Sequence, residues 1–185
     1  MPQVEYFFDC SSPWTYLSFT RIEQICDRYE AELIWKPILV GGVFNSVNES
    51  IYEQRANPVP VKASYYQKDL QDWARHQNIV IGSPSVFPVN SVKAMRGCFV
   101  AEEHKLLSEY ASNVFLAYWT ELKDISLIEV LDEILLKTGL DKDDFYLKIA
   151  SEPYKDKLRA NTEELINRGG FGSPTMFVNQ ADMYF

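Results

Sequence analysis

The apolar positions change their spacing along the chain, and these changes predict the order of the elements. Residues 4–8, which are apolar or aromatic except for Glu5, are typical of a short buried strand. Residues 14–29 carry apolar side chains at helical spacing, and residues 32–40 form a second strand-like run. A strand, a helix and a parallel strand within about 40 residues make a βαβ unit, whose crossover is right-handed almost without exception.

A long helical pattern follows in the middle of the chain. Residues 41–60 begin with two glycines and are polar and irregular, which predicts a loop over a site. Five helical segments are predicted after this loop, over residues 62–76, 92–103, 106–119, 127–137 and 145–150. Ser126 and Asp141 are the expected N-caps of the last two helices. Since no strand is predicted here, we interpret residues 61–150 as a helical insertion between two halves of one sheet.

The C-terminal part returns to a mixed pattern. We expect a helix followed by two strands that pair across a turn, over residues 154–167, 175–178 and 181–185. Ser173 and Pro174 come immediately before the first of these strands and fit a cis turn. This order of elements predicts an α/β protein with a thioredoxin-like fold and a large helical insertion. Residues 1–60 and 151–185 would form the thioredoxin-like domain.

Composition and charge narrow the class of protein. The chain has 185 residues, of which 46% are hydrophobic and 14% aromatic, enough for one packed core. The formal net charge of −8 leaves no basic stripe to neutralise nucleic-acid phosphates. No apolar run approaches the roughly 20 residues that span a membrane, and the first basic residue is Arg21, unlike a secretory signal. We therefore expect a cytoplasmic protein without a nucleic-acid or membrane partner.

The cysteines give no sign of a disulfide or of a metal site. Cys10, Cys26 and Cys98 are widely spaced, and neither Cys-x-x-Cys nor Cys/His metal spacing occurs. Cys26 and Cys98 fit the pattern of small core residues. Cys10 is less easily assigned, because it lies two residues from the strongest candidate for chemistry.

That candidate is the turn after the first strand, at Ser12. Pro13 suits the first turn of a helix, where a missing N–H costs nothing. Ser12 therefore stands at a helix N-terminus, at the carboxyl end of a strand. Free backbone N–H groups and the helix dipole favour an anion there, including a thiolate. A serine before a helix can equally be an N-cap and nothing more, and the local sequence leaves both interpretations open.

Several short motifs add a resemblance to a known family. They are Phe8-Asp9 with Ser12-Pro13 and Tyr16-Leu17, Asn57 with Pro58 and Lys62, Asp69-Leu70, Phe87-Pro88 with Asn90, Tyr154-Lys155 with Arg159-Ala160-Asn161-Thr162, and Phe171-Gly172-Ser173-Pro174-Thr175. Together they resemble the 2-hydroxychromene-2-carboxylate isomerases and the kappa-class glutathione transferases, over essentially the whole chain. These are thioredoxin-fold proteins with a DsbA-like helical insertion. The Cys-x-x-Cys of DsbA-like oxidoreductases would fall on Ser12 and Thr15, so we expect no disulfide exchange at this turn.

The resemblance implies a glutathione-dependent isomerase of the 2-hydroxychromene-2-carboxylate isomerase type. Ser12 would donate a hydrogen bond to the glutathione sulfur and stabilise the thiolate. Ser173, ahead of cis Pro174, would pair with the cysteinyl part of glutathione. The thiolate would add to the substrate, allow bond rotation and leave again, without a redox change or a metal.

The resemblance also implies further residues that contact glutathione or the substrate, although each of them could equally have a purely structural role. Asn57 and Lys62 match glutathione-binding positions, although a turn residue and a solvated lysine would look the same. Trp14, Phe44 and Asn90 are the candidates for contact with a small electrophilic substrate, aromatic or carboxylate, although core packing is the commoner fate of aromatic side chains. The resemblance further implies a homodimer.

Departures from the family pattern keep other functions open. Phe44 lies about where characterised isomerases have a substrate-contacting lysine, and Ser91 lies near a tyrosine in them. The family continues past its last strand with a Gly-x-Asp-Arg turn and a final helix, so either the chain is truncated at Phe185 or these elements are lost. The alternatives are a kappa-like glutathione transferase or peroxidase, and a non-catalytic thioredoxin-fold binding module.

Overall fold

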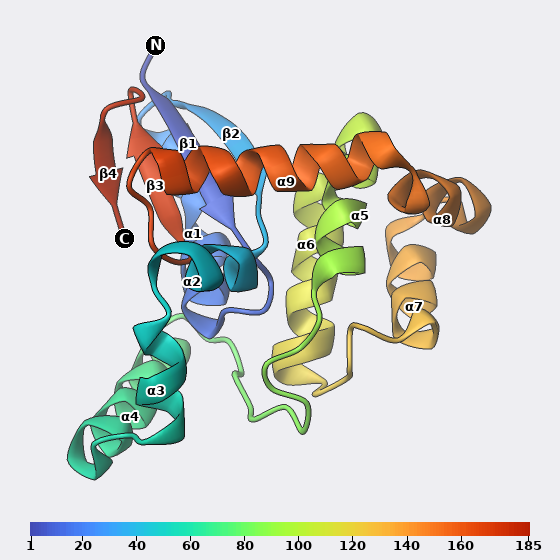
Figure 1. Cartoon of the computed structure of the whole chain (residues 1–185). Coiled ribbons are helices and arrows are strands. Elements are labelled where there is room, and N and C mark those ends of the chain that lie inside the picture. The colour runs from blue at the N-terminus through green and yellow to red at the C-terminus, as the bar shows by residue number, and fades with distance from the viewer.

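The four strands form one mixed sheet at the core of the N- and C-terminal parts (Figure 1). The computed structural model describes all 185 residues. The strands are β1 (Gln3–Phe8), β2 (Glu32–Pro37), β3 (Thr175–Val178) and β4 (Asp182–Tyr184), and they lie in the order β2-β1-β3-β4. β1 pairs parallel with β2 and antiparallel with β3, which pairs antiparallel with β4. The four predicted strands and their pairing are thus confirmed, although the second strand was expected to run to residue 40 and ends at Pro37.

Helices make up most of the rest of the chain. They are α1 (Pro13–Arg28), α2 (Val40–Val47), α3 (Ser50–Ala56), α4 (Pro60–His76), α5 (Val92–Glu103), α6 (Leu107–Phe115), α7 (Ile128–Thr138), α8 (Lys142–Ala150) and α9 (Glu152–Asn167), with a π-helical turn η1 (Leu116–Thr120) after α6. In Figure 1, α9 runs from the group α5–α8 back across the sheet, so it connects the two parts of the molecule. No helix is long and apolar enough to cross a bilayer.

Residues 41–60 correct the sequence prediction, because they form two short helices and not an irregular loop. Val43 is fully buried with Leu165 of α9 and Phe177 of β3. Gly42 lies so close to α9 that a Cβ at this position would be 3.3 Å from Thr162. The glycine that suggested a chain break therefore permits a close helix–helix contact, and tertiary packing outweighs its low helix propensity.

The expected N-caps had different outcomes. Asp141 caps α8, because its side chain accepts a hydrogen bond of 2.8 Å from the Asp144 N–H. Ser126 is not a cap, since α7 begins at Ile128 and no side chain caps it. Asp124 instead accepts the Ser126 N–H at 2.9 Å, so a turn precedes the helix.

The apolar run of β1 is buried on both faces of the sheet. Tyr6 and Phe8 pack into the larger core with α1, and Phe7 on the opposite face packs with Leu165 and Phe177. This alternation follows from the two-residue period of a strand. β1 is therefore held on both sides, which fixes the turn that follows it.

One glycine of α5 gives a sharp test of core packing. A Cβ at Gly97 would lie 2.6 Å from the buried ring of Phe145 and would also overlap Tyr110. We expect Gly97→Ala to lower the free energy of unfolding by about 2 kcal/mol, as overpacking does. Gly41 of α2 has no atom within 4 Å of such a Cβ, so Gly41→Ala should leave stability unchanged or raise it by up to about 1 kcal/mol. Urea unfolding of both variants checks this, and equal midpoints would contradict the packing described here.

Candidate active site

Ser12 occupies the N-cap of α1 and also contacts the C-terminal part of the chain. Its Oγ accepts the Thr15 N–H at 3.2 Å, so the N-cap interpretation is confirmed. The same hydroxyl donates to the Ser173 carbonyl at 3.0 Å, across 161 positions of sequence. Ser12 therefore does more than cap the helix, since it joins the turn after β1 to the turn before β3.

Ser173 precedes a cis peptide bond to Pro174 and is itself buried. Its Oγ accepts the Asp9 N–H at 3.0 Å and shares a hydrogen bond of 2.8 Å with the Thr15 hydroxyl. Its own N–H has no hydrogen-bond partner in the protein, and neither does the Trp14 N–H in the first turn of α1. Two backbone donors near the Ser12 hydroxyl are thus free to bind a ligand.

The Asp9 side chain stabilises the turn after β1 by hydrogen bonds. One carboxylate oxygen accepts the Ser11 N–H at 2.9 Å, and the other accepts the Val40 N–H at 2.9 Å and the Ser91 hydroxyl at 3.1 Å. The carboxyl group is fully buried, and this burial raises its pKa. Asp9 therefore ties the turn after β1 to the start of α2 and to the segment before α5. The sequence analysis named Asp9 only as part of a motif. A carboxyl group directly after Phe7-Phe8, at the end of a buried strand, could have indicated a buried group that needs hydrogen-bond partners.

A largely apolar cavity of about 480 Å³ lies beside the cis-proline turn. It is lined by Trp14, Leu17, Ser18, Trp73, Gln77, Ser173, Pro174, Met176 and Phe185. The cavity is thus enclosed by α1, α4 and β3, and three of the sequence-predicted site residues line it. An apolar cavity with a few polar groups at one end is the usual form of a small-molecule site.

A second group of side chains lies around Phe44, next to the segment that precedes Ser173. A Cβ placed on Gly172 would be 3.8 Å from the Phe44 ring, so this ring borders the segment before Ser173. The guanidinium carbon of Arg55 lies 5.3 Å from the centre of the Phe44 ring and 5.2 Å from that of Phe87. Sequence reasoning missed Arg55, because residues 41–60 were expected to form a loop without fixed positions.

The remaining predicted residues form no hydrogen bond or ion pair with Ser12 or Ser173. Asn57 is the exposed C-cap of α3, and Lys62 is exposed in the first turn of α4 without an ion pair. Asn90 is exposed, and its side chain accepts the Val92 N–H at 3.1 Å, as a turn residue does. The structure thus brings Ser12, Ser173 and the lining residues of the cavity together. The roles of Asn57, Lys62 and Asn90 stay predictions.

The cysteines are free and buried. Burial raises the pKa of Cys10, and the neighbouring Cys98 adds to this effect. Burial also raises the pKa of Cys26. A thiol with a raised pKa and no access to solvent is a poor nucleophile. A thiolate reacting at Ser12 would therefore have to come from a bound molecule.

Comparison with known proteins identifies the class to which this fold and site belong. A family model described as a DSBA-like thioredoxin domain matches residues 3–185. A 2-hydroxychromene-2-carboxylate isomerase from Pseudomonas sp. (strain C18) is 30% identical over 186 residues, which cover 95% of this chain and 81% of the relative. Glutathione S-transferase kappa 2 from Caenorhabditis elegans is 26% identical over 190 residues, covering 95% of this chain and 80% of the relative.

Solved structures agree with these sequence comparisons. The structure of a 2-hydroxychromene-2-carboxylate isomerase superimposes with a TM-score of 0.81 at 26% identity and covers 99% of this chain and 88% of that one. The chain belongs to the DsbA-like thioredoxin family and, within it, to the group of the 2-hydroxychromene-2-carboxylate isomerases and kappa-class glutathione transferases.

Proposed function

We propose that the protein is a glutathione-dependent isomerase of the 2-hydroxychromene-2-carboxylate isomerase type, in which Ser12 stabilises the glutathione thiolate. The observation that carries this proposal is the Ser12 hydroxyl itself. It stands at the N-terminus of α1 and 3.0 Å from the Ser173 carbonyl, next to a cis-proline and an apolar cavity. Relatives named as isomerases and as kappa-class glutathione transferases support a catalytic role.

The hydrogen bonds around Ser12 suit it to bind a thiolate. The Ser12 proton, which now goes to the Ser173 carbonyl, can turn to a sulfur anion by rotation about one bond. The Thr15 N–H keeps donating to the Ser12 oxygen, which makes the hydroxyl a better donor. The free N–H of Trp14 and the positive end of the helix dipole favour the anion further. A thiol bound here should have a lowered pKa.

Ser173 and Pro174 would position glutathione, and the cavity would hold the substrate. The Ser173 N–H is free to pair with the backbone of the cysteinyl residue, as an extended strand would. Trp14 would provide an apolar wall for an aromatic substrate. Asn57, Lys62 and Asn90 remain candidate contacts on the family resemblance alone.

The proposed reaction is balanced without a metal or an oxidant. The thiolate electron pair attacks the electrophilic carbon of the ring-opened enone and forms a C–S bond, and the former double bond becomes an enolate. Rotation about the carbon–carbon bond that is now single is followed by collapse of the enolate. This step breaks the C–S bond and regenerates the thiolate and the trans-alkene. Glutathione is therefore not consumed.

A kappa-like glutathione transferase is the second candidate, because a kappa-class enzyme is among the relatives. A transferase would form the same C–S bond but would release the conjugate as product. Measuring free glutathione before and after complete turnover separates the two, since only the transferase consumes it.

The thiolate itself provides the test of the proposal. We expect glutathione bound to the parent protein to ionise about one to two pH units below free glutathione, because a positive environment stabilises the thiolate. The ultraviolet absorbance of the thiolate, titrated with pH, measures this shift, and Ser12→Ala should return the titration close to that of free glutathione. A parent titration identical to free glutathione would refute the proposal.

A further inference from the structure

Arg55 is a cation held between two aromatic rings without an acidic partner. Its guanidinium carbon lies 5.3 Å from the ring centre of Phe44 and 5.2 Å from that of Phe87. Arg75, Arg159 and Arg168 all form ion pairs with carboxylates, whereas Arg55 forms none. A guanidinium that lies over ring faces keeps its N–H donors at its edge, where a ligand can reach them.

The packing of α3 against α2 fixes the start of this side chain. Phe44 and Tyr52 meet edge to face with ring centres 6.4 Å apart. The Tyr52 hydroxyl donates to the Asn45 side chain at 2.6 Å. Arg55 therefore extends from a helix that is tied to its neighbour, so the point from which its exposed side chain starts is fixed.

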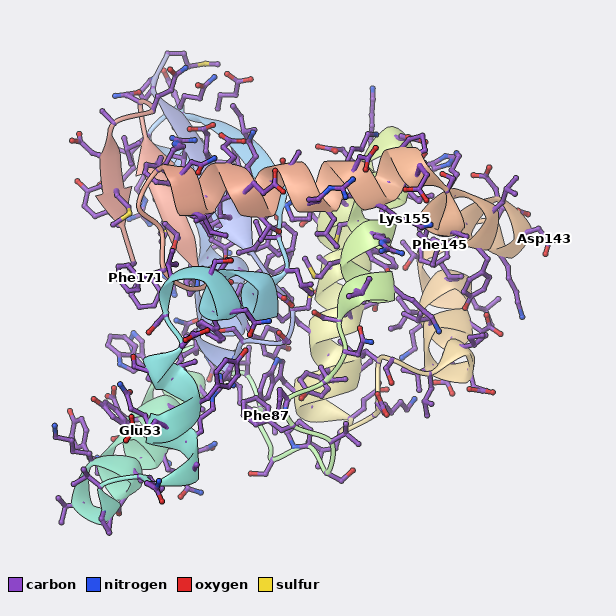
Figure 2. The ribbon with its side chains drawn as sticks, viewed as in Figure 1. Glu53, Phe87, Asp143, Phe145, Lys155 and Phe171 are labelled. Atoms are coloured by element: carbon purple, nitrogen blue, oxygen red, sulfur yellow. The ribbon has the colours of Figure 1, made fainter.

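The two rings connect Arg55 to both segments that flank Ser12. Phe44 borders Gly172, which directly precedes Ser173. Phe87 lies with its ring centre 6.1 Å from that of Trp119, and the Trp119 indole N–H donates to the Cys10 carbonyl at 2.9 Å. Figure 2 shows Phe87 in the loop next to α2 and α3. Arg55 is thus linked through Phe44 to the segment before Ser173, and through Phe87 and Trp119 to the turn that carries Ser12.

We propose that Arg55 binds a carboxylate group of a ligand at the Ser12 site, either of the electrophilic substrate or of glutathione. This inference rests on the proposed function and adds a specificity-determining residue to it. The guanidinium edge matches the two oxygens of a carboxylate, and the flanking rings suit a flat conjugated group next to it. The whole protein carries a formal net charge of −8, which repels an anionic ligand. A local cation such as Arg55 would offset this repulsion at the site.

The test compares ligands that differ only in one charge. trans-Cinnamate and its neutral amide probe the substrate side, and glutathione and its glycyl ethyl ester probe the glutathione side. Affinities are measured by calorimetry for the parent protein, Arg55→Gln and Arg55→Lys. Arg21→Gln is the matched control, because Arg21 is an exposed arginine of α1 that also lacks an ion pair.

We expect the parent to bind the charged member of one pair about ten-fold more tightly than the neutral member. Arg55→Gln should abolish this preference, Arg55→Lys should keep part of it, and Arg21→Gln should keep all of it. Loss of the preference for cinnamate assigns Arg55 to the substrate, and loss of the preference for glutathione over its ester assigns it to glutathione.

The inference is overturned if neither preference depends on Arg55, including the case in which the parent shows no preference. The thiolate titration distinguishes this failure from failure of the proposed function. Glutathione bound to the Arg55→Gln variant should still ionise at a lower pH than free glutathione, because Ser12 and the start of α1 are unchanged. Absence of that shift in the parent would count against the proposed function and not against Arg55 alone.

Discussion

Under the proposed function, replacing Ser12 by alanine should lower glutathione-dependent turnover of 2-hydroxychromene-2-carboxylate about a hundred-fold. The variant removes the hydroxyl that the proposal places on the bound thiolate, and loss of a single such donor typically has an effect of this size. Steady-state kinetics at saturating glutathione measure it. The effect should appear mainly in kcat, because the backbone groups of Trp14 and Ser173 remain available to bind the tripeptide.

Two further variants separate catalysis from helix capping. Ser12→Ala also removes an N-cap, so we expect it to lose about 1 kcal/mol of stability and to remain folded. Ser12→Thr keeps a hydroxyl and should retain more activity than Ser12→Ala at similar stability. Ser11→Ala removes the neighbouring hydroxyl, which bonds neither Thr15 nor Ser173, and should change turnover less than three-fold or so. Equal turnover in Ser12→Ala and Ser11→Ala would contradict the assigned role.

Replacing Asp9 by alanine should destabilise the protein by about 3 kcal/mol. The half-buried Ser11 N–H, the buried Val40 N–H and the Ser91 hydroxyl would all lose their acceptor, and each unsatisfied buried donor is costly. Asp27→Ala is the control, because Asp27 is exposed near the end of α1 and forms no ion pair. Denaturant unfolding of both variants at neutral pH measures the difference. Similar stability of the two would show that the Asp9 hydrogen bonds contribute little.

The same carboxyl group should make stability depend on pH in a defined direction. Burial raises the pKa of Asp9 above its ordinary value of 3.8, so the folded state binds its proton more tightly than the unfolded state does. The contribution of Asp9 to stability therefore falls as pH rises from 3.8 through the folded-state pKa, and it is constant above that. Asp9→Asn cannot ionise, so its stability relative to the parent should increase across this pH range. A difference that is independent of pH would contradict the raised pKa.

The sequence by itself determined the order of the elements and the position of the main candidate site. Residues 4–8, apolar or aromatic except for Glu5, predicted a buried strand, and Pro13 suited the first turn of a helix, so Ser12 was placed at a helix N-terminus. The cis turn at Pro174 was expected from its place before β3. These features are local, because a periodic pattern or a proline reports on the backbone within a few residues of itself.

Only the tertiary structure decided which distant groups meet around Ser12. Asp9 bonds Ser91 across 82 positions, Trp119 bonds the Cys10 carbonyl across 109, and Ser12 bonds Ser173 across 161. Gly42 of α2 packs against α9 where a loop was expected, and Arg55 of α3 lies near the rings of Phe44 and Phe87. A sequence pattern indicates which face of an element is buried but does not name its partner, because the partner depends on how the whole chain packs.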